Sequence, residues 1–198
     1  DKGLEPINMH LFEGVEKGVA AFQFLQRAQN IGKVIITLPS TMSCRSSAEY
    51  VLSGGMGAIG MVTGQYLVQE GAKVVNLLSR SGRPASDVEE QWAWLQESSA
   101  TVVARACDCA DKGAVKKLAK AIAEEAKTRG TKTEVAGLLH LAAVLDDATF
   151  PKLARENLVK SYAAKVFGGR HMHDEFTSGG KELDFSIFFS STSALLGS

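Results

Sequence analysis

The fold is decided by the stretch Ser53-Gly54-Gly55-Met56-Gly57-Ala58-Ile59-Gly60. Gly55, Gly57 and Gly60 form the pattern G-x-G-x-x-G, which follows a predicted strand at 50–53 and opens a predicted helix. Glycine lets the chain turn tightly and lets backbone N–H groups reach a pyrophosphate at the positive end of a helix. In this position the pattern predicts a dinucleotide-binding site, and the alternative is an ordinary glycine-rich turn.

Predicted strands and helices alternate on the C-terminal side of this stretch. The expected strands are 73–78, 101–107, 135–141 and 183–189, and helices are expected at 87–96 and after a capping Asp111. The helical sequence that follows residue 141 is expected to break near Gly168-Gly169. This alternation is typical of an α/β, doubly wound parallel sheet with helices on both faces.

The N-terminal part of the chain has a different organisation. A helix over 14–30 and a strand over 33–38 precede the short Ser-rich segment 40–47. We therefore expect residues 1–40 to be a helix-strand piece of another domain, 41–48 a linker, and 49–198 the nucleotide-binding domain. The chain starts without a Met and ends directly after an apolar run, so we expect a piece of a longer protein, C-terminally truncated in its sheet.

Composition excludes several classes of protein. The chain carries 22 Lys and Arg against 22 Asp and Glu, which argues against a nucleic-acid binder that relies on a strong positive field. No apolar run is long enough for a membrane span. Three cysteines, Cys44, Cys107 and Cys109, disfavour a disulfide framework and indicate a reducing, cytoplasmic location. The spacing Cys107-x-Cys109 has no second pair, so we expect thiols and no metal.

The second strand of the nucleotide-binding region indicates which cofactor binds. An NAD site usually has an Asp or Glu at the end of this strand, where it holds the ribose 2′-hydroxyl. Here the strand ends in Ser79-Arg80-Ser81, and a hydroxyl beside a guanidinium suits a 2′-phosphate, so NADPH is expected. Asp108, after the third strand, either accepts from the adenine amino group or is a capping or turn residue.

Beyond these residues the sequence resembles the ketoreductase domain of modular polyketide synthases and animal-type fatty acid synthases, in the short-chain dehydrogenase/reductase superfamily. The resemblance covers about residues 49–198 and is carried by motifs in the family's order. These are the glycine loop 53–60, the segments 78–82 and 107–111, the run 139–147 (Leu-His-Leu-Ala-Ala-Val-Leu-Asp-Asp), the run 164–168 (Ala-Lys-Val-Phe-Gly) and 183–191. Residues 20–36 resemble the closing segment of an enoylreductase domain, which precedes the ketoreductase in fully reducing synthases.

The resemblance assigns roles to individual residues. Ser191 corresponds to the Ser that hydrogen-bonds the ketone oxygen, and Lys165 to the lysine of the active site. The resemblance also implies cofactor contacts along the matched motifs, at Ser53, Gly55, Met56, Gly57, Ala58, Ile59, Gly60, Ser79, Arg80, Ser81, Asp108, Cys109, Ala142 and Ala143.

The chain departs from the family at two places. The family's Tyr proton donor and its Asn have no counterpart here, because Tyr162 precedes the Ser and is one residue short of the Tyr-x-x-x-Lys spacing with Lys165. Both are expected beyond Ser198, so the fragment alone is expected to be inactive. Ala143 stands where the family usually has Gly beside the nicotinamide ribose.

Leu145-Asp146-Asp147 matches the Leu-Asp-Asp signature of B-type ketoreductases, which the resemblance links to a D-hydroxyl and to guidance of the substrate arm; the acids alternatively belong to a plain loop. The resemblance thus implies NADPH-dependent reduction of a β-ketoacyl thioester on the phosphopantetheine of an acyl carrier protein, within a multidomain synthase. The alternatives are a stand-alone NADPH-dependent short-chain reductase and a structural nucleotide-fold domain without catalysis.

Overall fold

The protein is described by a computed structural model covering residues 8–28, 31–37, 44–129, 134–144, 146 and 149–191. The chain divides into two compact units, Asp1–Ser43 and Cys44–Ser198. Within the residues described, no helix combines the length and apolar character that crossing a bilayer requires.

The first unit is a small β-α-β piece. Strand β1 (Met9–Glu13) pairs in parallel with β2 (Lys33–Thr37), and a 3₁₀ turn (Val15–Lys17) leads into α1 (Gly18–Gln26). The sequence predicted the helix and β2 but not β1. Most large apolar side chains of this unit are exposed, and Ala21 is the buried residue of α1.

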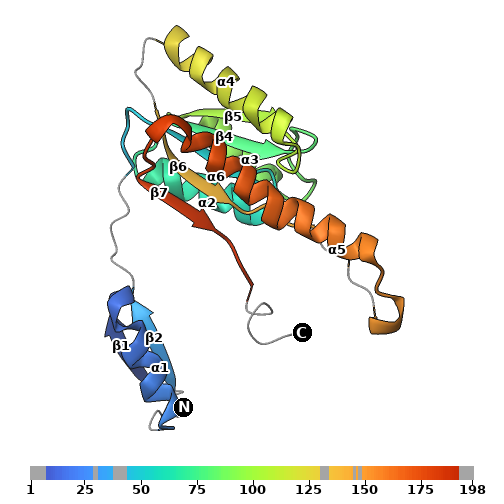
Figure 1. Cartoon of the computed structure of the whole chain (residues 1–198). Coiled ribbons are helices and arrows are strands. Elements are labelled where there is room, and N and C mark those ends of the chain that lie inside the picture. The colour runs from blue at the N-terminus through green and yellow to red at the C-terminus, as the bar shows by residue number, and fades with distance from the viewer. Residues whose placement is uncertain are drawn as a thin grey trace. The chain divides into compact units, whose positions relative to one another are not determined.

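The second unit is built on a five-stranded parallel sheet in the order β5-β4-β3-β6-β7 (Figure 1). The strands are β3 (Glu49–Ser53), β4 (Val74–Ser79), β5 (Thr101–Ala106), β6 (Val135–His140) and β7 (Phe185–Phe188). The helices are α2 (Ala58–Gln69), α3 (Glu89–Glu97), α4 (Lys112–Thr128), α5 (Arg155–Tyr162) and α6 (Gly168–Phe176). Strand order turns back on itself between β3 and β6, so the predicted doubly wound sheet is confirmed.

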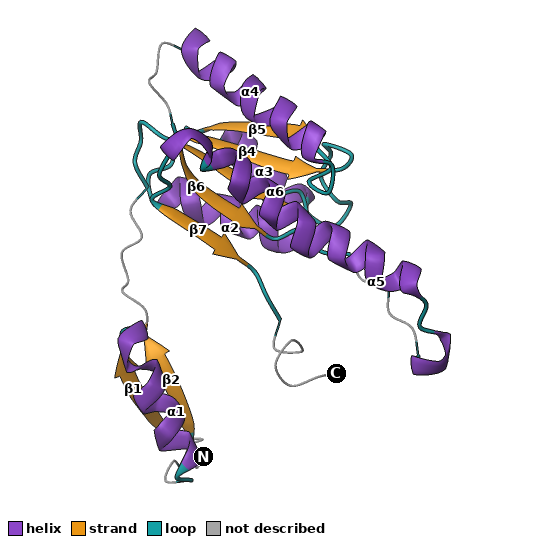
Figure 2. Cartoon of the chain, in the orientation of Figure 1, coloured by secondary structure: helices purple, strands orange, loops and turns teal. Residues whose placement is uncertain are grey.

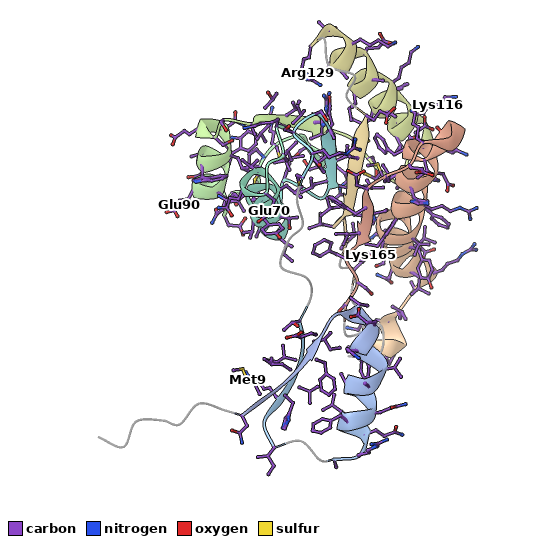
Figure 3. The ribbon with its side chains drawn as sticks, turned by 90° about the vertical axis from the view of Figure 1, so that its left-hand side faces the viewer. Met9, Glu70, Glu90, Lys116, Arg129 and Lys165 are labelled. Carbon is purple, nitrogen blue, oxygen red and sulfur yellow. The ribbon has the colours of Figure 1, made fainter. Side chains whose placement is uncertain are left out.

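Helices cover both faces of this sheet. Figure 3 shows the sheet edge-on, with α2 and α3 on one side and α4 and α6 on the other. The buried face of β3 and β4 toward α4 and α6 includes Val51 and Leu78, packed with Ile122 and Met172. Buried apolar side chains on both sides explain why the strands read as continuous apolar runs. Asp111 caps α4 as predicted, because its Oδ1 accepts from the N–H groups of Gly113 and Ala114 at 2.7 and 3.2 Å.

The predicted helix break at Gly168-Gly169 is wrong. One helical rod runs from α5 through a π-helical turn (Ala163–Phe167) into α6, as Figure 2 shows. Gly168 has helical dihedral angles, φ −58° and ψ −48°. The glycines serve close packing, because a Cβ at Gly169 would lie 2.9 Å from the Phe188 ring and 3.0 Å from the His140 ring.

Candidate nucleotide-binding site

A cavity of about 780 Å³ opens at the carboxyl edge of the five-stranded sheet. Each of the five strands contributes residues from its carboxyl end: Gly54 and Gly57 after β3, Ser79 and Arg80 at β4, Cys107 and Asp108 after β5, Leu141 and Ala142 after β6, and Phe189 and Ser190 after β7. This is the crevice of a doubly wound sheet, beside the strand-order reversal, where ligands of such folds bind.

The glycine loop packs too closely for a side chain at Gly54 and at Gly60. Gly54 has φ +70°, and a Cβ there would lie 2.7 Å from the backbone nitrogen of Ala142. A Cβ at Gly60 would lie 2.5 Å from the Gly54 carbonyl oxygen and 2.5 Å from the Gly55 Cα. The loop is thereby held between the start of α2 and the segment after β6.

The N-terminus of α2 faces the cavity. Gly57 is its N-cap residue, and among the residues that the structure describes no side chain caps this end of α2. A Cβ at Gly57 would find its nearest neighbour at 3.7 Å, so the space beside it is open. Ala58, Ile59 and Gly60 also line the cavity. The first-turn N–H groups and the helix dipole therefore favour an anion here.

The end of β4 carries a cation and one hydroxyl group at the cavity. Ser79 and Arg80 line it, and Arg80 is exposed. Ser81 does not line the cavity: its hydroxyl lies 3.3 Å from the Ser79 hydroxyl and accepts from the Arg83 N–H at 3.2 Å. The Ser79 hydroxyl also accepts from the Gly82 N–H at 2.9 Å. These bonds fix the turn from which Arg80 projects.

The end of β5 contributes a carboxylate and two thiols. Asp108 accepts from the Ala110 N–H at 3.0 Å through Oδ1, so the predicted turn role is observed and a second oxygen remains. The contact with Cys107 and burial raise the pKa of Cys109, which therefore stays a thiol. Both cysteines are buried side chains that line the cavity.

The loop after β6 is tied to α5. Ala142, Ala143 and Val144 line the cavity, and the Ser161 hydroxyl donates to the Val144 carbonyl at 3.3 Å. Lys160 forms a 3.0 Å ion pair with Asp146 and lowers the pKa of that carboxyl. Leu145 and Asp147 lie outside the described residues.

Lys165 lines the same cavity from the π-helical turn (Figure 3). Ser190, immediately before Ser191, lines it at the end of β7. The structure thus brings Lys165 and the segment of Ser191 to the glycine loop, although more than 100 residues separate them in the chain. π-Helical turns occur frequently at functional sites.

Several of the predicted contact residues lie outside the cavity lining. Met56 is buried, Gly55 packs against Leu77, and Ser53 is buried and bonded to His140. Ser191 follows the lining Ser190 directly in the chain but is not itself a lining residue. Lys160, Phe189 and Ser190 were not predicted as lining residues. Phe189 and Ser190 lie in the matched segment 183–191 and could have been found there, whereas nothing local distinguishes Lys160. The role of His140 was also missed, although its place at the end of a buried strand was visible.

Fold and cavity together define a nucleotide-binding domain of the short-chain dehydrogenase/reductase type. Residues 48–198 match the model of the family described as KR domain. The chain therefore belongs to the KR domain family, the ketoreductases of polyketide synthases.

Relatives from bacteria and fungi agree with this membership. The phenolphthiocerol synthesis polyketide synthase type I Pks15/1 of Mycobacterium marinum is 34% identical over 183 residues, 90% of this chain and 8% of that protein. The highly reducing polyketide synthase g433 of a Fusarium species is 31% identical over 209 residues, 98% of this chain and 8% of that protein. A solved structure described as an A1-type ketoreductase is 31% identical, with a TM-score of 0.67, over 81% of this chain and 32% of that chain. The chain spans less than a tenth of the length of these two synthases.

Proposed function

We propose that the cavity binds NADPH and that the second unit is the cofactor-binding part of a β-ketoacyl reductase. The observation that carries the proposal is the meeting of the uncapped α2 N-terminus, Arg80 and Lys165 in one cavity. A pyrophosphate fits the N-terminus of α2, where Gly57 leaves open space. A 2′-phosphate fits the Arg80 guanidinium.

The remaining cofactor contacts follow from this placement. The second carboxylate oxygen of Asp108 would accept from the adenine amino group, while Oδ1 keeps its bond to the Ala110 N–H. Ala142 and Ala143, which line the cavity, would hold the nicotinamide ribose. The methyl group of Ala143 narrows the approach where the family usually has Gly, which weakens binding relative to a glycine at this position.

When bound, NADPH supplies the hydride for the ketone carbon. The Ser191 hydroxyl donates a hydrogen bond to the ketone oxygen and so stabilises the negative charge that grows there. The Lys165 ammonium favours the ionised form of a nearby phenol and orients it. That phenol, the proton donor, is the family's Tyr, which we expect after Ser198. This chain alone is then expected to be inactive, since general acid catalysis supplies roughly 100- to 10,000-fold.

The product is proposed to carry a D-hydroxyl. Asp146, held to α5 by Lys160, belongs to the Leu-Asp-Asp segment that resembles the B-type signature. The neighbour described as A1-type shares the fold at 31% identity, so overall likeness does not decide the type. Chiral analysis of the product from the full-length protein tests the proposal, and an L-hydroxyl would contradict it.

The proposed substrate is a β-ketoacyl thioester carried on the phosphopantetheine of an acyl carrier protein, in a multidomain cytoplasmic synthase. The Fusarium relative, described as highly reducing, aligns with 98% of this chain and so extends into the first unit. This supports assigning residues 1–40 to the end of an enoylreductase domain, with 41–48 as the linker. A stand-alone reductase would leave the first unit without a role.

The test is NADPH oxidation with a β-ketoacyl thioester analogue, on residues 1–198 and on the full-length protein. We expect turnover in the full-length protein only. Comparable turnover by both would mean that the proton donor is misassigned. No turnover in a full-length protein that binds NADPH would favour the structural, non-catalytic alternative.

A further inference from the structure

A buried histidine joins the glycine loop to the segment that carries Lys165. His140 ends β6 and is 1% exposed. Its Nδ1 lies 2.5 Å from the Ser53 hydroxyl, at the start of the glycine loop. Its Nε2 lies 3.0 Å from the Lys165 carbonyl oxygen and 3.1 Å from the Ala164 carbonyl oxygen. Nothing in the proposed reaction uses this side chain.

The partners of His140 determine where its proton sits. Carbonyl oxygens only accept hydrogen bonds, so Nε2 must carry a proton. Burial lowers the pKa of His140, so the ring is neutral near pH 7 and Nδ1 accepts from the Ser53 hydroxyl. The chain of bonds thus runs in one direction, from Ser53 through the ring to the helical turn.

The bonded carbonyls belong to the π-helical turn. In that turn the Gly168 N–H donates to the Ala163 carbonyl, five residues back, which is the π-helical spacing. The imidazole reaches the turn because Gly168 and Gly169 have no side chains: a Cβ at Gly169 would lie 3.0 Å from the ring. The Phe188 ring, with its centroid 5.8 Å from that of His140, covers another side of the imidazole.

We propose that His140 is a positioning residue that holds the Lys165 turn at a fixed place relative to the glycine loop. This inference rests on the proposed function. The Lys165 side chain is long and flexible, so the position of its ammonium depends on how firmly its backbone is held. A bond to the Lys165 carbonyl itself fixes that backbone, and the bond to Ser53 ties it to the loop that holds the cofactor.

Two substitutions separate this role from mere packing. In His140→Gln the amide nitrogen takes the place of Nε2 and keeps a donor toward the turn. In His140→Asn the amide is shorter and replaces only the Nδ1 side, so the carbonyls of Ala164 and Lys165 lose their donor. His173→Asn is the matched control for packing: His173 is an exposed histidine on α6 whose ring contacts Phe188, at 6.2 Å between centroids, and it takes no part in the hydrogen bonds of His140.

We expect His140→Asn to lower kcat of the full-length protein about 100-fold, because misplacing a reacting group by about 1 Å has that effect. KM for NADPH should change by less than about 3-fold, since the nucleotide contacts remain. His140→Gln should lower kcat by no more than about 5-fold, because it keeps the donor to the Lys165 carbonyl and loses only the acceptor for the Ser53 hydroxyl. His173→Asn should not differ from the unaltered protein. Equal loss in both His140 variants, or full activity in both, would overturn the proposal.

A second measurement does not depend on whether the variants fold. The ¹⁵N chemical shifts of the His140 ring in the unaltered chain distinguish a protonated from an unprotonated nitrogen. We expect a proton on Nε2, and an Nε2 without one would overturn the proposal. If the full-length protein reduced no ketone, the proposed function would fail, whereas this result would still show whether the ring donates to the turn.

Discussion

Replacing Gly60 by Ala should destabilise the second unit, although alanine is the better helix former. The new Cβ would lie 2.5 Å from both the Gly54 carbonyl oxygen and the Gly55 Cα. Both are backbone atoms, so the loop itself must move. Overpacking of this kind costs about 1–3 kcal/mol, and the upper part of that range applies to backbone neighbours. The higher helix propensity of alanine offsets about 1 kcal/mol of this cost, so we expect the free energy of unfolding to fall by about 1–2 kcal/mol.

Gly64→Ala, one turn further along α2, is the matched control. There the new Cβ would meet its nearest atom, Leu77 Cδ2, at 3.4 Å, which is an ordinary contact. The propensity gain of up to about 1 kcal/mol then remains, so stability should be unchanged or higher.

Urea denaturation followed by tryptophan fluorescence measures both variants. The chain has two tryptophans, Trp92 and Trp94, and both lie in α3, so the signal reports the second unit. A Gly60→Ala chain as stable as the unaltered one, or a Gly64→Ala chain destabilised to the same degree, would refute the close-packing argument.

Three further predictions concern stability. Arg129→Met should cost about 3–5 kcal/mol in urea denaturation, because it leaves the fully buried Glu49 carboxylate without its 2.5 Å ion-pair partner; a loss below 1 kcal/mol would contradict this. Asp111→Ala should cost about 1 kcal/mol by removing the α4 cap, and an unchanged denaturation midpoint would argue against the cap. Burial lowers the pKa of His140 below 6.5, so the unfolded chain binds more protons just below that pH. The free energy of unfolding should therefore fall as pH drops from 6.5 toward the folded-state pKa; His140→Gln should show a shallower fall, and an identical pH dependence would count against a buried neutral ring.

The sequence predicted the sheet because its strands are short apolar runs between turn signals, and those are local features. It missed β1, where exposed Met9 and Leu11 alternate with His10 and Phe12, so the pattern lacks a polar face. Gly168-Gly169 was predicted to break the helix, whereas these glycines continue it and make room for the His140 and Phe188 rings. That reason lies in side chains 19 or more residues away and is invisible locally.

The candidate site likewise contains local features that the sequence predicts and long-range contacts that it does not. The positions of the glycine loop and of Arg80 at the cavity were predictable because each is a local feature: the glycine pattern directly follows β3, and Arg80 directly follows β4. The links from Ser53 to His140 and from His140 to Lys165 join residues 87 and 25 positions apart. Such pairs depend on the register of parallel strands and on the π-helical turn, neither of which the sequence displays.

The most direct test of the nucleotide-binding claim compares the affinities of NADPH and NADH by calorimetric titration of the full-length protein. Arg80→Asp carries the test, and Arg83→Asp is the control, since Arg83 is an exposed arginine of the same turn that does not line the cavity. We expect NADPH to bind more tightly than NADH, and Arg80→Asp to weaken NADPH by about 1–3 kcal/mol with little effect on NADH. Arg83→Asp should keep the preference. Equal loss for both cofactors in Arg80→Asp, or no preference in the unaltered protein, would contradict the account.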